Sequence, residues 1–255
     1  MKKWALITGA SQGIGYEFAK LFAADGYNLA ILARDQPRLQ QVADELRARH
    51  GVTVKVLTKD LAVPGAAKEI FNELEREQFP ISILVNNAGF GFKGAFAELA
   101  LQGELDLIQV NMTALVELTR LFLTPMLARR EGRILNVASI AAFQPGPFMS
   151  LYYASKAFVY SFSCALADEV AGTGVTVTVL CPGLTHSQFH ARAGLTRKHG
   201  LFMNADEVAR DGYHALMKGK PVIVSGFMNK LGANIAKALP TRLTTRLAGK
   251  MNQSM

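Results

Sequence analysis

Short apolar runs alternate with longer amphipathic stretches along most of the chain. The apolar runs are 4–8 (WALIT), 28–33, 52–58, 81–86, 133–138, 174–181 and 221–225. Between them, helical spacing of apolar positions occurs in residues 13–24, 36–50, 66–77, 104–130, 151–172 and 205–218. Strands that alternate with helices form a parallel sheet covered by helices on both faces. The pattern predicts an α/β fold over residues 1–225, with a doubly wound parallel sheet of about seven strands in a single domain.

Residues 226–255 are predicted to form a basic, amphipathic C-terminal extension. Its larger aliphatic side chains recur at four-residue steps on either side of Pro240, at Leu231, Ile235 and Leu239, then Leu243 and Leu247. No acidic residue follows Asp211, and seven lysines and arginines do, so much of the net charge of +8 lies here. Such a segment is open to three interpretations: it packs across the site or another subunit, it lies on an anionic membrane surface, or it binds nucleic acid. Aromatic side chains that stack on bases are absent from residue 229 onward, which argues against nucleic acid.

The bulk composition suits one large globular domain. The chain has 255 residues, of which 50% are hydrophobic, and no run approaches the ~18 apolar residues typical of a membrane-spanning helix. The start, MKKWALITGA, resembles a signal peptide, but its apolar run ends after about five residues in a glycine-rich segment. We therefore interpret it as a first strand and expect a cytoplasmic protein. Cys164 and Cys181 show no metal-ligand spacing and are expected to be free thiols.

The first strand leads into the glycine-rich segment TGASQGIG, residues 8–15, and then into a helix. The glycines are Gly9, Gly13 and Gly15. Glycines in such a turn let the backbone approach a pyrophosphate, which then lies at the helix N-terminus. The strand, glycine loop and helix together predict a dinucleotide site.

The end of the second strand indicates which dinucleotide is bound. An acidic residue there binds the ribose hydroxyl of NAD, whereas this chain has Ala33 followed by Arg34. A guanidinium suits the additional phosphate of NADP. We interpret Asp35 as the N-cap of the next helix. Alternatively, Arg34 is a solvated surface charge. Asp60, after the third strand, either bonds the adenine amine or caps a turn.

Ser139, Tyr152 and Lys156 form the candidate catalytic group. Tyr152 and Lys156 are four residues apart, so on a helix both side chains lie on one face. A nearby ammonium favours a phenolate and lowers the pKa of a tyrosine. Such a tyrosine can give or take a proton in carbonyl or alcohol chemistry, and Ser139 can hold the reacting oxygen beside it. The candidate residues Arg34, Asp60, Asn87, Ser139 and Pro182 all follow predicted strands, where ligands of parallel sheets bind.

These motifs in this order resemble the short-chain dehydrogenase/reductase family over residues 4–225. The matching segments are TGASQGIG, Asp60-Leu61, NNAG (86–89), Asn111, Ser139, YYASK (152–156) and PGLTHS (182–187). The resemblance implies a Rossmann fold and reversible hydride transfer between a nicotinamide and a carbonyl or alcohol. It implies cofactor contacts from Gly9, Ser11, Gln12, Gly13, Ile14, Gly15, Arg34, Asp60, Leu61, Asn87, Ala88, Gly89, Tyr152, Lys156, Pro182, Gly183, Thr185 and Ser187.

The same resemblance implies the catalytic roles. Tyr152 is the acid and base, Lys156 holds the nicotinamide ribose and lowers the pKa of Tyr152, and Ser139 orients the substrate oxygen. Asn111 bends its helix and holds a water that relays protons to Lys156. Arg34 after Ala33 resembles the members that prefer NADP(H); many of these also carry a basic residue in the glycine loop, where this chain has Gln12. The basic extension resembles that of the DltE-like group, and family members are homodimers or homotetramers.

The substrate is expected to be an apolar, lipid-like carbonyl or alcohol. Residues 184–204 have poor periodicity and are predicted to form a lid that excludes water. The surrounding sequence is rich in phenylalanine, and the predicted substrate contacts are Phe90, Phe143, Pro145, Met149 and Phe189, with Phe92, Phe148 and Phe202 as further candidates. His186 and His190 are interpreted as lid or surface residues, and no metal is expected. Two alternatives are a 3-oxoacyl thioester reductase and a non-catalytic dinucleotide-binding protein associated with a membrane.

Overall fold

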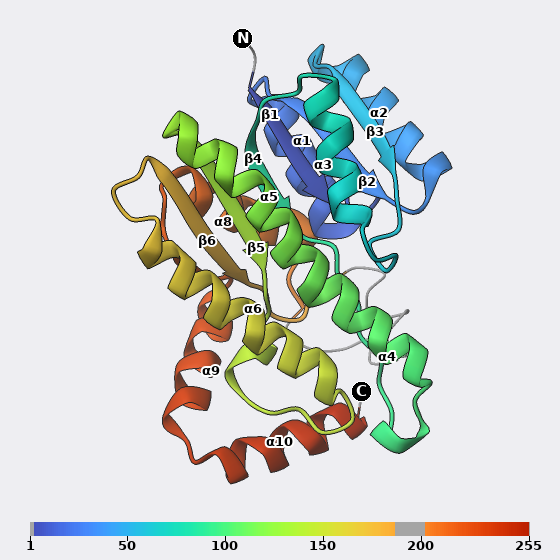
Figure 1. Ribbon diagram of the computed structural model, residues 1–255. Coiled ribbons are helices and arrows are strands. Elements are labelled where there is room, and N and C mark those ends of the chain that lie inside the picture. The colour runs from blue at the N-terminus through green and yellow to red at the C-terminus, as the bar shows by residue number, and fades with distance from the viewer. Residues whose placement is uncertain (1–2, 187–201, 255) are drawn as a thin grey trace.

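A seven-stranded parallel sheet forms the centre of the molecule, as the alternating pattern predicts (Figure 1). The computed structural model describes residues 3–186 and 202–254. The sheet has the order β3-β2-β1-β4-β5-β6-β7. Its strands are β1 (Trp4–Thr8), β2 (Asn28–Ala33), β3 (Val54–Thr58), β4 (Ile81–Asn86), β5 (Gly132–Val137), β6 (Val175–Cys181) and β7 (Val222–Val224).

Helices cover both faces of the sheet. They are α1 (Gly13–Ala24), α2 (Gln36–His50), α3 (Ala66–Arg76), α4 (Leu101–Ile108), α5 (Ala114–Arg129), α6 (Ser150–Glu169), α8 (Ala205–Met217), α9 (Phe227–Ala238) and α10 (Thr241–Ser254). Successive residues of a strand point to opposite faces. Accordingly, Ile7 packs with α1, α2 and α8, whereas Leu6 packs on the other face with α3 and α5. Both faces of β1 are therefore buried, which explains its continuous apolar sequence.

The predicted helix over 104–130 differs from the structure in two respects. It begins at Leu101 and is interrupted by a π-helical turn, Gln109–Thr113, between α4 and α5. Such a turn inserts an extra residue into the helix and is frequent at functional sites. Asn111 lies within this turn and its side chain bonds the backbone of a neighbouring loop, an interaction that periodicity does not reveal.

The strand order changes direction at β1, which lies between β2 and β4. From β1 the chain winds outward to β3 on one side, and from β4 it winds outward to β7 on the other. In sheets of this kind the crevice at the carboxyl ends of the strands beside this point is the ligand site. The topology therefore brings the loops after β1, β2, β4, β5 and β6 to one end of the molecule.

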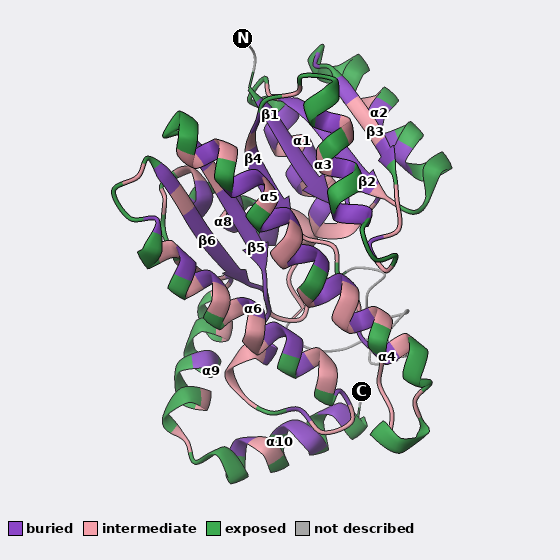
Figure 2. Ribbon diagram, viewed as in Figure 1, coloured by how far each residue is buried: buried purple, intermediate pink, exposed green. Residues whose placement is uncertain are grey.

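The C-terminal extension consists of two helices that lie outside the sheet (Figure 1). Helix α10 buries small or polar residues, namely Thr244, Ala248, Gly249 and Asn252. Its leucines point outward, with Leu243 45% and Leu247 54% exposed. Figure 2 shows much of α9 as exposed and the buried positions of α10 on the side toward the body of the protein. Across the described ranges, no helix is both long enough and apolar enough to span a membrane.

Candidate functional site

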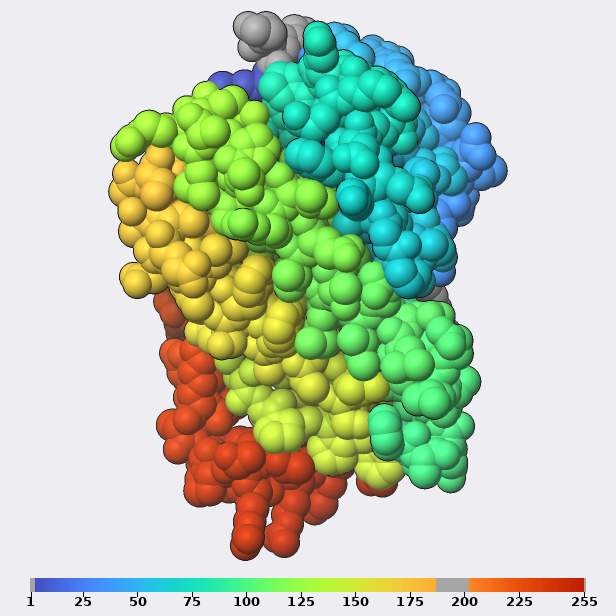
Figure 3. All heavy atoms as spheres, viewed as in Figure 1, coloured from blue at the N-terminus to red at the C-terminus, as the bar shows by residue number. Residues whose placement is uncertain are grey.

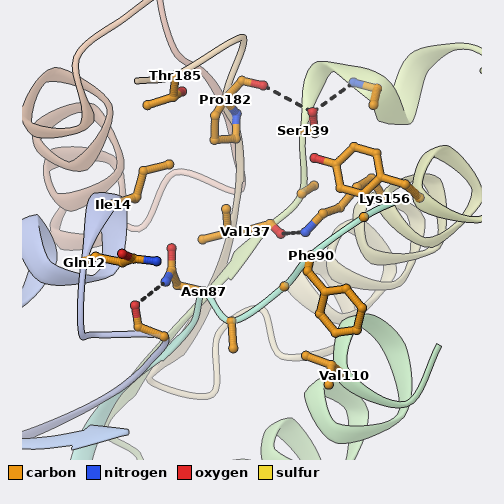
Figure 4. Close-up of a pocket in the computed structure, with 18 of the residues that line it drawn as sticks. Gln12, Ile14, Asn87, Phe90, Val110, Val137, Ser139, Lys156, Pro182 and Thr185 are labelled. Carbon is orange, nitrogen blue, oxygen red and sulfur yellow. Dashed lines mark hydrogen bonds between the residues drawn. The ribbon is translucent and has the colours of Figure 1, made fainter. Parts of the chain in front are cut away.

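A cavity of about 930 Å³ opens at the carboxyl ends of the strands (Figure 4). Its walls include most of the residues that the sequence predicts for the cofactor: Gly9, Ser11, Gln12, Gly13, Ile14, Arg34, Asp60, Leu61, Asn87, Ala88, Gly89, Tyr152, Lys156, Pro182, Gly183 and Thr185. Gly15 lies just behind the wall, and Ser187 lies outside the described residues. Segments that are far apart in the sequence thus meet around one space.

The glycine loop has a backbone conformation that favours glycine. Gly9 and Gly13 have φ values of +68° and +57°, in a region that side chains with a Cβ rarely adopt. Gly15 serves a different purpose, because a Cβ there would overlap the carbonyl oxygen of Gly9. The loop therefore folds tightly over the first turn of α1, and its backbone faces the cavity.

The N-terminus of α1 is available for an anion. The side chain of its N-cap residue, Gln12, makes no capping hydrogen bond to the helix among the described residues. The next helix differs, because Asp35 accepts a hydrogen bond from the backbone N–H of Arg38 at 3.0 Å and so caps α2 as predicted. Free N–H groups and the helix dipole together attract negative charge. The first turn of α1 therefore fits a pyrophosphate.

Arg34 and Asp60 form an ion pair at the edge of the cavity. Arg34 Nη1 lies 3.4 Å from Asp60 Oδ2, and the Arg34 side chain is 61% exposed. Asp60 Oδ1 also accepts the backbone N–H of Ala62 at 2.9 Å, so this carboxylate caps a turn. A second arginine, which the sequence analysis did not single out, supports the glycine loop: Arg38 Nε donates to the carbonyl oxygen of Ser11 at 3.2 Å.

The end of β4 is fastened to the glycine loop by Thr8 and Asn87. Thr8 Oγ1 accepts the backbone N–H groups of Asn87 and Ala88, each at 2.9 Å. The Asn87 amide donates to the carbonyl oxygen of Thr8, also at 2.9 Å. Three hydrogen bonds therefore hold two cavity walls at a fixed separation. The role of Thr8 was not predicted, since a threonine at a strand end carries no distinctive signal.

The candidate catalytic residues come together deep in the cavity. Lys156 is 5% exposed, and its Nζ donates to the carbonyl oxygen of Val137 at 2.9 Å. Ser139 Oγ accepts the backbone N–H of Ala141 at 3.1 Å and forms a side-chain hydrogen bond with Tyr152. Figure 4 shows Lys156 and Ser139 on the same side of the cavity, opposite Gln12 and Ile14. This group therefore borders the same space as the glycine loop.

Burial determines the charge state of these groups. It raises the pKa of Tyr152 to about 12, although the hydrogen bond with Ser139 acts in the lowering direction. Burial also lowers the pKa of Lys156 to about 8. The sequence analysis expected the ammonium to lower the pKa of Tyr152, but desolvation dominates, with Lys156 Nζ 5.8 Å from the centre of the tyrosine ring. At neutral pH Tyr152 is therefore a phenol.

Asn111 is buried behind this group and fixes the loop after β4. Its amide donates to the carbonyl oxygen of Phe90 at 2.9 Å, and its Oδ1 accepts the Phe90 N–H at 3.1 Å. The same amide donates to Ser155 Oγ at 3.1 Å, within α6. A Cβ on Gly89 would lie 3.1 Å from Asn111 Oδ1 and 3.3 Å from Lys156 Nζ. Asn111 and Lys156 therefore both pack closely against Gly89, which has no Cβ to hold them apart.

A buried amide network beneath the site aligns α6 with the sheet. Asn86 Nδ2 donates to Asn136 Oδ1 at 2.9 Å, and Asn136 Nδ2 donates to Ser163 Oγ at 2.9 Å. These residues belong to β4, β5 and α6 and are almost fully buried. The sequence analysis missed Asn136 and Ser163, because isolated polar residues in apolar elements give no sign of their partners.

The predicted substrate contacts are only partly confirmed as cavity residues. Phe90 and Met149 line the cavity, whereas Phe143 and Pro145 do not. Phe143 packs instead against Tyr160 of α6, with ring centres 5.1 Å apart. Phe189 and most of the predicted lid fall on residues 187–201, outside the described part of the chain. His186 stacks on Phe202 at 4.8 Å.

Two residues of the C-terminal extension line the cavity as well. They are Asn229 of α9 and Met251 of α10. Neither was predicted, because the periodicity of the extension indicates helices but not what they cover. In residues 3–186 and 202–254, no cluster of three histidines, cysteines or carboxylates could hold a metal ion.

The fold and cavity define a protein that binds a dinucleotide in the manner of a Rossmann fold. The sequence profile described as short chain dehydrogenase matches residues 3–198. The chain therefore belongs to the short-chain dehydrogenase family, as the motifs indicate. Its finer grouping with DltE-like proteins stays a prediction.

Several known proteins are similar to this chain. 17-beta-hydroxysteroid dehydrogenase type 3 of Mus musculus is 40% identical over 188 residues, 71% of this chain and 60% of the relative. A very-long-chain 3-oxoacyl-CoA reductase of Phaeosphaeria nodorum is 39% identical over 180 residues, 68% of this chain and 52% of the relative. The chain thus spans about half to three fifths of the length of these relatives.

Solved structures agree with the fold over almost the whole chain. A short-chain dehydrogenase from Sphingobium yanoikuyae in complex with NADPH has a TM-score of 0.84 and 30% identity, covering 93% of this chain and 96% of its own. A 7beta-hydroxysteroid dehydrogenase has a TM-score of 0.88 and 26% identity, covering 96% of each chain.

Proposed function

We propose that this protein is an NADP(H)-dependent oxidoreductase that interconverts the carbonyl and alcohol forms of an apolar, lipid-like substrate. The observation that carries this proposal is the buried group of Ser139, Tyr152 and Lys156 on the wall of a cavity shared with the glycine loop. A phenol that keeps its proton at neutral pH, beside a hydroxyl that can hold an oxygen, suits proton donation to a carbonyl.

The cavity fits a dinucleotide. The uncapped first turn of α1 and the backbone of Gly9 and Gly13 would hold the pyrophosphate. Arg34 would hold the additional phosphate of NADP, since Asp35 is occupied as the cap of α2. When bound, NADP(H) supplies or accepts the hydride. The solved relative from Sphingobium yanoikuyae contains NADPH, which supports this choice of cofactor.

The protein's own side chains would position the reactants and transfer the proton. Tyr152 would donate its proton to the substrate oxygen in reduction and accept it in oxidation, while Ser139 orients that oxygen. Lys156 would hold the nicotinamide ribose beside Tyr152. By the family resemblance Asn111, which packs against Gly89 close to Lys156 Nζ, would hold a water that returns a proton to Lys156. These assignments combine the family resemblance with the contacts described above.

The relatives support an apolar substrate. Their names refer to hydroxysteroids and very-long-chain 3-oxoacyl-CoA. The walls near Tyr152 include Phe90, Phe92, Val110 and Met149, which offer apolar surface rather than partners for sugar hydroxyls. A 3-oxoacyl thioester reductase is the alternative within this class. Equal rates on free and carrier-bound substrates, at low and high salt, would argue against that alternative.

The substitution Tyr152→Phe tests the reaction. Removing the phenolic hydroxyl should lower turnover of a reducible ketone by about 10²–10⁴-fold and leave the Kd of NADPH unchanged. Tyr160→Phe is the matched control, because it lies on the same helix and contacts Phe143 instead of the cavity. Retained turnover in Tyr152→Phe would overturn the catalytic assignment. Absence of turnover in the unaltered protein, with NADPH bound, would instead favour the non-catalytic dinucleotide-binding alternative.

The C-terminal extension is proposed to rest on an anionic membrane surface. Six of the large apolar side chains that are exposed belong to α9 and α10 and do not line the cavity: Phe227, Met228, Leu231, Ile235, Leu243 and Leu247. Lys230, Arg242, Arg246 and Lys250 accompany them in the sequence, with no acidic residue, whereas Lys237 Nζ lies over the Phe143 ring. In Figure 3 these helices edge the lower part of the molecule, and side chains of α10 project from it. Two such surfaces would repel each other, whereas anionic lipid headgroups would attract them.

Co-sedimentation with vesicles tests the membrane contact. The protein should bind vesicles that contain phosphatidylserine and bind phosphatidylcholine vesicles weakly. The double substitution Leu243→Ser and Leu247→Ser should reduce binding, whereas Val63→Ser, at a position 57% exposed before α3, should not. Equal binding by all variants would remove the proposal. Self-association that depends on Leu243 and Leu247 would instead identify this surface as a contact between copies.

A homodimer or homotetramer is proposed from family membership. Light scattering at several protein concentrations would measure the mass. A monomer at micromolar concentration would contradict this assignment. The division of the chain at residue 225 also stays a prediction.

A further inference from the structure

The last turn of α10 contacts the helix that carries Tyr152. Asn252 is fully buried, although it lies three residues from the end of the chain. Its Oδ1 accepts a hydrogen bond from the Tyr153 hydroxyl at 3.1 Å, and its Nδ2 donates to the carbonyl oxygen of Pro147 at 2.8 Å. One side-chain amide thus connects α10 to two parts of the site: the first turn of α6 and the segment that follows Ser139.

Small residues bring these elements into close contact. Ala248 of α10 packs in a cluster with Ala141, Met149 and Tyr153. A Cβ on Gly249 would lie 3.2 Å from the Pro147 ring, so α10 passes close to that segment. A Cβ on Gly146 would overlap the ring of Tyr153. The buried face of α10 therefore follows the shape of the segment after Ser139, as expected for a fixed wall rather than a loosely attached tail.

Met251 differs from the leucines of the same helix. Leu243 and Leu247 point away from the protein, whereas Met251 lines the cavity and remains 40% exposed. It precedes Asn252, so its position depends on the two hydrogen bonds of that residue. Met149 and Tyr153, which neighbour α10 in the buried cluster, also line the cavity on the side of Tyr152. Met251 therefore stands at the outer end of the part of the cavity that faces the substrate.

We propose that α10 is the outer wall of the substrate cavity, that Asn252 holds this wall in place, and that Met251 limits the size of the substrate's apolar end. This inference rests on the proposed function, because it concerns the substrate of that same site. Asn252 acts through its neighbours and is a positioning residue, whereas Met251 is a residue that determines specificity. The flexible methionine side chain adapts to different apolar groups, which suits a wall that meets lipid-like molecules.

Substitutions of Met251 test the wall with a series of methyl n-alkyl ketones of increasing chain length. Met251→Ala should raise kcat/KM for the longest ketone relative to the shortest by about tenfold, and Met251→Trp should lower that ratio by about tenfold. Met228→Ala, a methionine 54% exposed on α9, is the matched control and should leave the ratio unchanged. The Kd of NADPH should be the same in all variants, because Met251 lies on the substrate side.

Substitutions at Asn252 and at its hydrogen-bond partner Tyr153 test how α10 is held in place. Asn252→Ala should relax the chain-length preference in the same direction as Met251→Ala, through KM rather than kcat, since Tyr152 and Lys156 are unaltered. Tyr153→Phe, which removes one of the two hydrogen bonds, should have a smaller effect on the same ratio. Asn234→Ala, at an exposed asparagine of α9, is the control. If Asn252→Ala fails to fold, the Tyr153→Phe and Met251 variants still decide the question.

Calorimetric binding of the same ketones separates this inference from the proposed function. Binding of the ketones without turnover in the unaltered protein would overturn the proposed function. The role of α10 as a wall could then still be tested through the Kd values of the ketones. Chain-length preference that is unchanged in Met251→Ala and Met251→Trp, by turnover and by Kd, would overturn the inference alone. No binding of any ketone would count against both.

Discussion

The two ends of the cavity are built in different ways. At the glycine loop the walls are backbone: Gly9 and Gly13 occupy unusual dihedral angles, and Thr8 holds the backbone of Asn87. Around Tyr152 the walls are side chains, such as Met149 and Met251, which are distant in sequence. The first end comes from turns that directly follow strands of the sheet. The second depends on how α6 and α10 pack outside it.

This difference has consequences for how each end tolerates substitution. A backbone wall has little room to adjust, because its atoms are fixed by the sheet and its hydrogen bonds. A wall of side chains changes its shape whenever one residue changes, and the fold is kept. The end that fits a dinucleotide common to many enzymes is therefore rigid, and the end that meets the substrate can vary. The predictions below test this contrast.

Gly15→Ala should have the largest effect of the predicted substitutions. Its Cβ would overlap the carbonyl oxygen of Gly9, so the loop must move. We expect the Kd for NADPH to rise by about a hundredfold and the free energy of unfolding to fall by about 1–3 kcal/mol. Calorimetric titration and denaturant unfolding measure the two effects.

Gly232→Ala is the matched control for this contrast, because both glycines lie within helices. Among the described residues, no atom apart from its chain neighbours and its own helix backbone lies within 4 Å of a Cβ at Gly232, which is exposed on α9. The substitution should stabilise the protein by about 1 kcal/mol, the usual gain when alanine replaces glycine inside a helix. A similar loss of cofactor binding in both variants would show that the glycine loop is not specially constrained.

The same contrast explains how much could be predicted from the sequence. The strands, the glycine loop and the Asp35 cap follow from local rules, since apolar runs, glycines and capping residues act on their immediate neighbours. Phe143 was expected in the cavity and lies outside it, whereas Met251 lines the cavity without having been expected. Which side chain faces a cavity depends on packing between distant segments, and no local pattern records it.

The pKa of Tyr152 illustrates a second limit. The spacing of Tyr152 and Lys156 correctly places both on one helix, and the effect of the ammonium was expected to dominate. The structure buries both residues so deeply that desolvation outweighs this attraction and raises the pKa of Tyr152. Spacing reveals which groups are neighbours, but not how much water surrounds them.

Arg34→Ala tests how the rigid end selects its cofactor. Losing a charged hydrogen-bond donor to a phosphate costs about 1.5–3 kcal/mol, or roughly a ten- to hundredfold rise in Kd. NADPH affinity should fall accordingly, and NADH affinity should stay the same. Arg49→Ala, an exposed arginine of α2 paired with Glu45, is the control. If the unaltered protein binds NADH as tightly as NADPH, Arg34 is a surface charge and an oxidative alcohol dehydrogenase becomes the better assignment.

Lys156 lies where the two ends meet, and its buried charge should be visible in the pH dependence of stability. Its pKa is about 8 in the folded protein, against an ordinary value of 10.5. Between these values the unfolded chain binds more protons than the folded one, so the free energy of unfolding rises with pH from about 8 upward. Lys156→Met removes this contribution but keeps a long apolar side chain. Denaturant unfolding of both proteins at pH values from neutral to about 10 should show the unaltered protein gaining stability relative to Lys156→Met above pH 8. Comparing the two proteins cancels the contribution of Tyr152 to the pH dependence. The raised pKa of Tyr152 makes stability fall in both proteins above pH 10, the ordinary pKa of a tyrosine. If the difference in free energy of unfolding between the two proteins is constant across this range, Lys156 is well solvated. The rigid end of the cavity, whose walls are backbone, would then not extend to the catalytic group.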